Sequence, residues 1–337
     1  MLGRRCAAGA LAAACVASGL LVSSAPTSAA TNLKHTPPGR VLVISANLRE
    51  AYRGPDDILG RHYDDVEETK EISTFALRLK QRQSYKPDVL LLQEVVSPTA
   101  RRVARAMTAR FGDPYRAKVR PRKMFPRGVD ANPLVERETA IVYNRATMEA
   151  VNRGGYFRIR QKDEDLKPSW RKRFRDNAHL LLREKGTRMT VATMSVHFLV
   201  LDAFVSFEQH VIRRAAWARR INRFMDRTYR KADVRVMGGD FNSRRCQTLP
   251  ETLICDELGF WDAMTDRPRL DDSVFVRNSM SDSDIQQQAG TRKRIDYIFA
   301  RPTTFAASHD LAYDKEIGDT NFISDHRYVR AIVGKRL

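Results

Sequence analysis

The stretch that most constrains the fold of this chain is 234–243, with the sequence VRVMGGDFNS. Its first half is a short apolar segment typical of a buried strand, and it runs into two glycines, an aspartate and an asparagine. Asp240 and Asn242 are two residues apart, so an extended backbone points both side chains to the same side. The glycines allow other backbone or a ligand to come close. The stretch predicts an oxygen-rich site at the end of a strand, although Gly-Asp-Phe-Asn is also a favourable turn sequence.

Residues 1–30 have the features of a secretory signal peptide. A basic start is followed by an apolar run from Ala7 to Val22, and Ser28-Ala29-Ala30 offers small residues for cleavage. The run is too short and poorly flanked to be a spanning helix; an uncleaved N-terminal anchor is the alternative. We therefore expect a secreted protein with a polar lead-in at 31–39 and one large domain at 40–337.

The charge of the chain favours a polyanionic partner. The formal net charge is +19, and removal of Arg4 and Arg5 with the signal peptide leaves +17. Nucleic acid, an anionic membrane face and a wall polymer all fit this balance, and it also fits simple solubility. In an oxidising environment, Cys246 and Cys255 are expected to form a disulfide; two buried free thiols are the alternative.

Apolar runs and helical periodicity predict an alternating α/β chain. The predicted strands are 40–47, 87–95, 139–144, 178–182, 189–197, 234–240, 294–300 and 328–333. The predicted helices are 66–83, 98–111 and 203–231. Most of these strands are continuously apolar, which indicates that both faces of their sheets are covered.

Two segments are basic, 114–138, which is predicted to be irregular, and 156–177. The second interleaves cations with aromatic residues around Arg171, Lys172 and Arg173. Such a pattern suits contacts with phosphates and stacking on bases, so these three residues are candidate substrate-binding residues. A solvated insertion explains the same pattern equally well.

Polar residues gather where the predicted strands end. They comprise four carboxylates, two amides and two histidines: Asn47, Glu94, His197, Asp240, Asn242, Asp296, Asp325 and His326. Ligands bind at this edge of α/β sheets. Because clustered carboxylates repel one another, either a cation such as Mg²⁺ or Mn²⁺ lies among them or the strand ends do not converge.

The order and spacing of these residues resemble the endonuclease/exonuclease/phosphatase superfamily, the deoxyribonuclease I-like fold. The segments that carry the resemblance are Asn47, Gln93-Glu94, Ser195-Val196-His197, Gly239–Asn242, Arg294–Tyr297 and Ser324-Asp325-His326. They span nearly the whole of residues 40–337. The resemblance implies a four-layer α/β sandwich, in which two mixed β-sheets pack together and helices flank them.

The resemblance also implies a metal site. Glu94 matches the principal metal carboxylate of the superfamily, with Asn47 and Asp325 nearby. The expected cofactor is Mg²⁺, with Mn²⁺ as the alternative.

The remaining matches imply roles in phosphoryl chemistry. Asp240 and Asn242 match the pair that orients the attacking water and contacts the phosphate. His326 matches the histidine beside the phosphate, oriented by Asp296, and His197 matches a second phosphate-contacting histidine. Whether a histidine acts as acid or base stays open at this point.

These features together predict a secreted, metal-dependent phosphodiesterase, most simply a nuclease acting on DNA. The alternative keeps the site and changes the substrate to a phospholipid, such as sphingomyelin or an anionic phosphoinositide, or to a sugar-phosphate ester. Membrane-acting members would be expected to carry an exposed apolar hairpin, and the sequence shows no clear one. A non-enzymatic binding module has no need of the full set of site residues, and no protein partner is implied.

Overall fold

A computed structural model describes residues 32–48, 65–95, 97–119, 138–160, 174–198, 207–243, 247–248, 253–254, 263–264, 296–301 and 328–334. Residues 33–337 form one compact unit, and residues 1–32 form another. All the elements below belong to the larger unit. Within the described part of the chain, no helix combines the length and the apolar character needed to cross a membrane.

The first sheet has five strands in the order β13-β1-β2-β4-β3. Their bounds are β13 (Val329–Gly334), β1 (Arg40–Asn47), β2 (Val89–Val95), β4 (Glu138–Asn144) and β3 (Tyr115–Lys118). β1 and β2 are parallel, and the other pairs are antiparallel. The sheet is therefore mixed.

The second sheet has six strands in the order β12-β9-β8-β7-β5, with β6 also paired to β7. Their bounds are β12 (Asp296–Arg301), β9 (Val234–Asp240), β8 (Thr190–His197), β7 (Phe174–Glu184), β5 (Met148–Ala150) and β6 (Gly155–Arg160). β8 and β9 are its parallel pair. A separate short ribbon joins β10 (Gln247–Thr248) to β11 (Leu253–Ile254).

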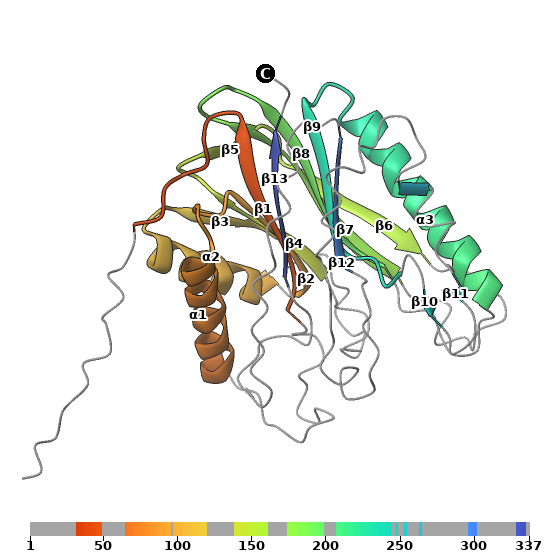
Figure 1. Cartoon of the computed structure of the whole chain (residues 1–337), viewed down its shortest axis with the longest axis horizontal. Coiled ribbons are helices and arrows are strands. Elements are labelled where there is room, and N and C mark those ends of the chain that lie inside the picture. The colour runs from red at the N-terminus through yellow and green to blue at the C-terminus, as the bar shows by residue number, and fades with distance from the viewer. Residues whose placement is uncertain are drawn as a thin grey trace, which may run out of the picture. The chain divides into compact units, whose positions relative to one another are not determined.

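The two sheets face each other, and helices cover their outer sides (Figure 1). α1 (Asp65–Arg82) and α2 (Ser97–Phe111) cover the first sheet, and α3 (Phe207–Thr228) covers the second. Alternation along β1 divides its side chains between two cores: Val41 and Val43 face the other sheet, and Leu42 and Ile44 face the helices. The predicted four-layer sandwich is confirmed.

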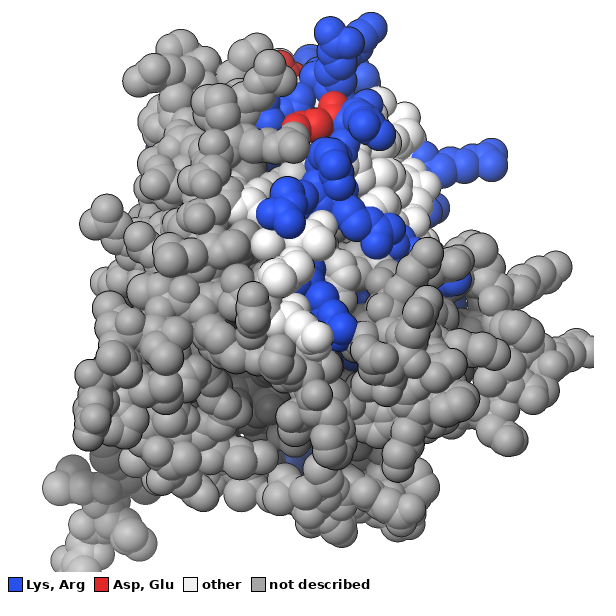
Figure 2. Space-filling view, turned by 90° about the vertical axis from the view of Figure 1, so that its right-hand side faces the viewer, with Lys and Arg blue, Asp and Glu red and all other residues white. Residues whose placement is uncertain are grey.

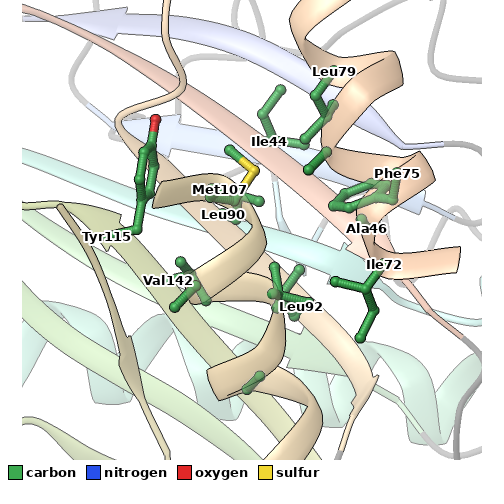
Figure 3. Close-up of a cluster of buried hydrophobic side chains, with 14 of the residues drawn as sticks. Ile44, Ala46, Ile72, Phe75, Leu79, Leu90, Leu92, Met107, Tyr115 and Val142 are labelled. Atoms are coloured by element: carbon green, nitrogen blue, oxygen red, sulfur yellow. The ribbon is translucent and has the colours of Figure 1, made fainter. Parts of the chain in front are cut away.

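The helical cover is held by apolar stripes that the sequence shows. Ile72, Phe75 and Leu79 of α1 lie three or four residues apart and pack onto Leu90 and neighbouring strand residues (Figure 3). On the opposite side of the molecule, α3 buries Ala215, Ala218, Ile221 and Met225 against the second sheet. Each helix is amphipathic because only one of its faces meets a sheet.

The parallel pairs bring strand ends to one edge of the sandwich. In the first sheet, Asn47 at the end of β1 is level with Gln93 of β2. In the second sheet, Asp240 at the end of β9 is level with His197 of β8 on one side and Asp296 of β12 on the other. With Glu94, which follows Gln93, five of the predicted positions lie at these strand ends, and a hydrogen bond of 3.1 Å from Asn47 to Asp240 joins the ends of the two sheets.

Both basic segments contain strands. Tyr115–Lys118 forms edge strand β3, and the basic segment 156–177 contains most of β6 and the start of β7. These strands pair with β4 and with each other in antiparallel register. The expectation of irregular structure at 114–138 was therefore wrong for Tyr115–Lys118, and the strands within 156–177 were not predicted.

Candidate active site

The glycine pair of β9 allows the backbone to pack closely against its neighbours. The sequence alone also allowed the approach of a ligand at this position, and the contacts of the glycines do not support that alternative. A Cβ atom on Gly239 would lie 1.8 Å from the carbonyl oxygen of Val196 in β8. A Cβ atom on Gly238 would lie 2.8 Å from Leu91 Cδ1 of the facing sheet. These contacts leave no room for a larger residue, so the glycines bring Asp240 close to both β8 and the first sheet.

Both carboxylate oxygens of Asp240 are held by hydrogen bonds. Oδ1 accepts from the backbone N–H of Asn242 at 2.7 Å, and Oδ2 accepts from Asn47 Nδ2 at 3.1 Å. Asn242 has a φ of 47°, a left-handed conformation that asparagine tolerates. Its side chain donates to the carbonyl oxygen of Phe198 at 2.8 Å, so it also ties the ends of β8 and β9 together.

Glu94 reaches the site because the backbone of β2 is distorted at this residue. Regular alternation would place its side chain on the helix-covered face, beside Leu92. Instead the pairing of β2 with β4 shifts register between Gln93 and Val95, and Glu94 has a φ of 53°. A bulge of this kind redirects a side chain, and here it turns the carboxylate toward the second sheet.

The carboxylate of Glu94 is buried and only partly satisfied. Oε1 accepts from Asn47 Nδ2 at 3.4 Å and lies 3.5 Å from His197 Nε2. Oε2 is buried and has no hydrogen-bond partner among the residues that the structure describes. A buried carboxylate oxygen in this state is costly, and a cation is a natural partner for it.

His197 completes the cluster from the second sheet. Its side chain is fully buried, and Nε2 lies 3.5 Å from Glu94 Oε1 and 3.9 Å from Asp240 Oδ2. The backbone N–H of His197 donates to Asn177 Oδ1 at 2.7 Å. Asn177 also donates to the carbonyl oxygen of Phe157, so one buried amide joins β6, β7 and the end of β8.

A polar bridge crosses between the sheets directly behind the cluster. Gln93 Nε2 donates to Ser195 Oγ at 2.9 Å, and Ser195 Oγ donates to the carbonyl oxygen of Leu92 at 2.7 Å. Sequence reasoning assigned no role to Gln93, Ser195 or Asn177, although Gln93 and Ser195 lie in segments that carry the family resemblance. For Asn177, the signal is a polar residue beside an apolar strand.

Aromatic rings pack around Phe241, which lies between Asp240 and Asn242 in the sequence. Phe241 lies edge-on to Phe198, Tyr297 and Phe299, with ring centroids 5.2, 5.9 and 5.4 Å away. The Tyr297 hydroxyl donates to the carbonyl oxygen of Ser243 at 3.0 Å. This packing fixes the chain on both sides of Asp240 and Asn242.

The residues present fit a divalent cation. One ligand atom from each of Glu94, His197 and Asp240 lies within 4.8 Å of the others, and all three residues are buried. Two carboxylates so close together repel unless a positive charge separates them. Asn47 Nδ2 donates to both carboxylates, so Asn47 positions them in this arrangement. Rotation of its amide group would turn Oδ1 toward the cluster, where it could bind a cation.

The remaining predicted residues divide into two groups. Asp296 is almost fully buried and is level with Asp240 on the neighbouring strand. Those outside the described residues are Asp325, His326, Arg171, Lys172, Arg173, Cys246 and Cys255, so their roles and the disulfide stay predictions. β13 begins at Val329, opposite Ser45 and next to the edge that carries Asn47.

Two facing mixed sheets with carboxylates and a histidine at their shared edge define the deoxyribonuclease I-like class of phosphoester hydrolases. The model of the endonuclease/exonuclease/phosphatase family matches residues 57–326, and the chain belongs to this family. It is a phosphoric ester hydrolase, and enzymes of the family generally depend on a divalent metal.

Solved structures show the same fold at low sequence identity. An endonuclease/exonuclease/phosphatase from Bacteroides vulgatus is 15% identical, with a TM-score of 0.60 over 88% of this chain and 99% of that one. A mannosyl-6-phosphatase from Bacteroides thetaiotaomicron is 18% identical, with a TM-score of 0.53 over 86% and 98%. TDP2 from D. rerio, complexed with a single-strand DNA product, is 12% identical, with a TM-score of 0.52 over 88% and 99%. A search of curated proteins returned no significant match.

Proposed function

We propose that this protein is a secreted, Mg²⁺-dependent phosphodiesterase that hydrolyses DNA. The observation that carries the proposal is the buried cluster of Glu94, His197 and Asp240, in which one carboxylate oxygen of Glu94 has no partner among the described residues. Such a cluster suits Mg²⁺ or Mn²⁺, which prefer carboxylate oxygens. Glu94 and Asp240 would hold the ion, joined by Asp325 from the segment before β13.

The reaction adds water across a phosphodiester bond. The oxygen of water attacks phosphorus, the bond from phosphorus to one ester oxygen breaks, and that oxygen takes a proton to leave as an alcohol. A bound divalent ion neutralises charge on the phosphoryl oxygens and lowers the barrier to attack.

The residues of the chain orient this reaction. Asp240 is fixed through both of its oxygens, so it can accept a hydrogen bond from the attacking water in one geometry. His197, whose Nε2 lies 3.5 Å from Glu94 Oε1, is the candidate for donating an imidazole N–H to a phosphate oxygen. His326, oriented by Asp296, is the candidate for protonating the leaving oxygen.

The choice of DNA has two supports. The net charge of +19 favours a substrate with many phosphates, and one protein of the same fold has been solved with a single-strand DNA product. The mannosyl-6-phosphatase of the same fold supports the alternative, a phosphate-ester substrate. An anionic phospholipid is the other alternative, and an assay of this activity has to present the lipid in a bilayer.

Plasmid cleavage tests the proposal. We expect the purified protein to convert supercoiled plasmid to nicked and linear forms with Mg²⁺ or Mn²⁺ and to leave it intact with EDTA. The isosteric variant Asp240→Asn should be inactive. A suitable control is Glu149→Gln, because it removes a partly exposed carboxylate that pairs with Arg183 and Arg188, outside the cluster.

Two results would contradict the proposal. Intact plasmid with every metal would exclude DNA cleavage, and sphingomyelin vesicles and sugar phosphates would then be the next substrates to test. Equal cleavage by wild type and Asp240→Asn would remove the cluster from the reaction.

A further inference from the structure

A cationic groove lies between α2, β3 and the turn that joins β5 to β6. Its volume is about 970 Å³. Five cationic residues line it, and none of the described residues that line it is acidic. The five are Arg101, Arg105, Arg116, Lys118 and Arg153.

Among the residues that the structure describes, no acidic side chain neutralises the positive charges of the groove. Within the described chain, none of the five forms an ion pair, unlike Arg158, which is paired to Asp176 at 2.8 Å. The Lys118 ammonium donates to the carbonyl oxygen of Arg153, a neutral acceptor. Burial, together with the nearby charge of Arg116, lowers the pKa of Lys118. Like charges held this close favour the binding of an anion.

The groove approaches the catalytic edge along the first sheet. β3 runs toward that edge, and its last residue, Lys118, pairs with Ile141 of β4. Two residues nearer the edge, Thr139 of β4 pairs with Gln93, which precedes Glu94. Two strand spacings and two residues along a strand amount to roughly 12 Å between Lys118 and Gln93.

The arrangement of the cations favours an extended polyanion. Arg101, Arg105, Arg116 and Arg153 are exposed along the groove, so a polymer that follows it toward the catalytic edge would contact several of them at once. Tyr115 and Tyr143 line the groove but are nearly buried, so the groove offers contacts to phosphates and few surfaces for bases. We propose that this groove binds the sugar-phosphate backbone of a polynucleotide strand whose scissile phosphate lies at the Glu94–His197–Asp240 cluster. This inference rests on the proposed function and names a polynucleotide as its substrate class.

A second basic surface provides a matched comparison. Figure 2 shows Lys and Arg gathered over the side of the molecule that carries α3. Arg219 and Arg223 are exposed there and four residues apart, as Arg101 and Arg105 are on α2. α3 lies on the outer face of the second sheet, and none of its residues lines the groove.

The binding test compares two double variants of the full chain, each also carrying Asp240→Asn to prevent cleavage. Affinity for a fluorescent 20-nucleotide single strand is measured by anisotropy across a salt series. Arg101→Ala/Arg105→Ala should weaken binding about 10- to 30-fold near 0.1 M salt and reduce the salt slope by about 1.4, because two phosphate contacts are lost. Arg219→Ala/Arg223→Ala should change both quantities little.

The activity test separates the groove from the catalytic site. In the presence of Mg²⁺, with position 240 unchanged, the α2 double variant should lose activity on the 20-nucleotide strand. It should hydrolyse the small diester bis(4-nitrophenyl) phosphate as fast as the parent. Failure of the parent on both substrates would contradict the proposed function, and the anisotropy measurement would still test the groove.

Three results would overturn the inference. Unchanged affinity in the α2 double variant would show that the groove does not contact the strand. An equal loss in the α3 double variant would show that overall charge, and not the groove, governs binding. Loss of binding to phosphatidylglycerol vesicles, with DNA binding intact, would assign the groove to a membrane.

Discussion

We expect the cluster of Glu94, His197 and Asp240 to destabilise the metal-free wild-type protein relative to the variant Glu94→Gln. In Glu94→Gln, the shape of the side chain is kept and its charge is removed. The ligand atoms of Glu94 and Asp240 lie within 4.8 Å of each other. With an effective dielectric constant of about 20, two unit charges at that distance repel by about 3 kcal/mol.

Thermal unfolding with and without metal measures this effect. In EDTA at pH 8, Glu94→Gln should melt about 5 °C above wild type, since about 3 kcal/mol corresponds to that shift in a domain of about 300 residues. With Mg²⁺ at about 100 times its dissociation constant, wild type should gain about 2.7 kcal/mol and the variant much less. The advantage of the variant should therefore nearly vanish.

Two outcomes would refute this reasoning. A lower melting temperature for Glu94→Gln in EDTA would mean that the protein itself stabilises the carboxylate, including Oε2. A wild-type melting temperature that does not change when Mg²⁺ is added would mean that the cluster binds no ion. Glu149→Gln serves as the control, because its response to metal should match that of wild type.

Two further predictions concern residues outside the cluster. Asn177→Ala removes the acceptor of the His197 backbone N–H, so kcat on DNA should fall at least about tenfold with KM nearly unchanged; an unchanged kcat would show that Asn177 does not position the histidine. Burial raises the pKa of Asp88 from 3.8 to about 6, so the native protein binds this proton more tightly than the unfolded chain does. The free energy of unfolding should therefore decrease by about 3 kcal/mol as the pH rises from about 4 to 6. Denaturant titrations should show this pH dependence in wild type and lose it in Asp88→Asn, and equal dependence in both would exclude Asp88 as its source.

Strand-end residues were predictable where the backbone is regular. The apolar runs before Asn47, His197 and Asp240 marked buried strands, and parallel pairing then placed their ends at one edge. The order of the segments identified the family, and the family implied the sandwich that the sheets confirm.

The position of the Glu94 side chain was not predictable from periodicity. Alternation along β2 assigns it to the helix-covered face, and only the bulge and the positive φ turn it toward His197. Conformations of this kind are set by tertiary contacts and leave no sign in the local sequence.

The basic strands were missed for a different reason. Tyr156, Arg158 and Arg160 alternate with Phe157 and Ile159, which is the period of a strand, yet the density of cations suggested either contacts with nucleic acid or a solvated insertion. The structure uses this alternation: Ile159 is buried, and the Phe157 ring stacks on Phe224 of α3 with centroids 4.6 Å apart. Phe157 is half-buried, and Phe224 covers one face of its ring.

The cluster draws its members from both halves of the sandwich. Glu94 and the positioning group Asn47 come from the first sheet, and His197 and Asp240 come from the second, so neither sheet alone carries all three ligand candidates. A folding intermediate with one completed sheet would carry either Glu94 or the His197–Asp240 pair, and not the complete cluster. The cluster therefore forms only once the two sheets have docked, and metal binding at the cluster would report on the docking of the two sheets.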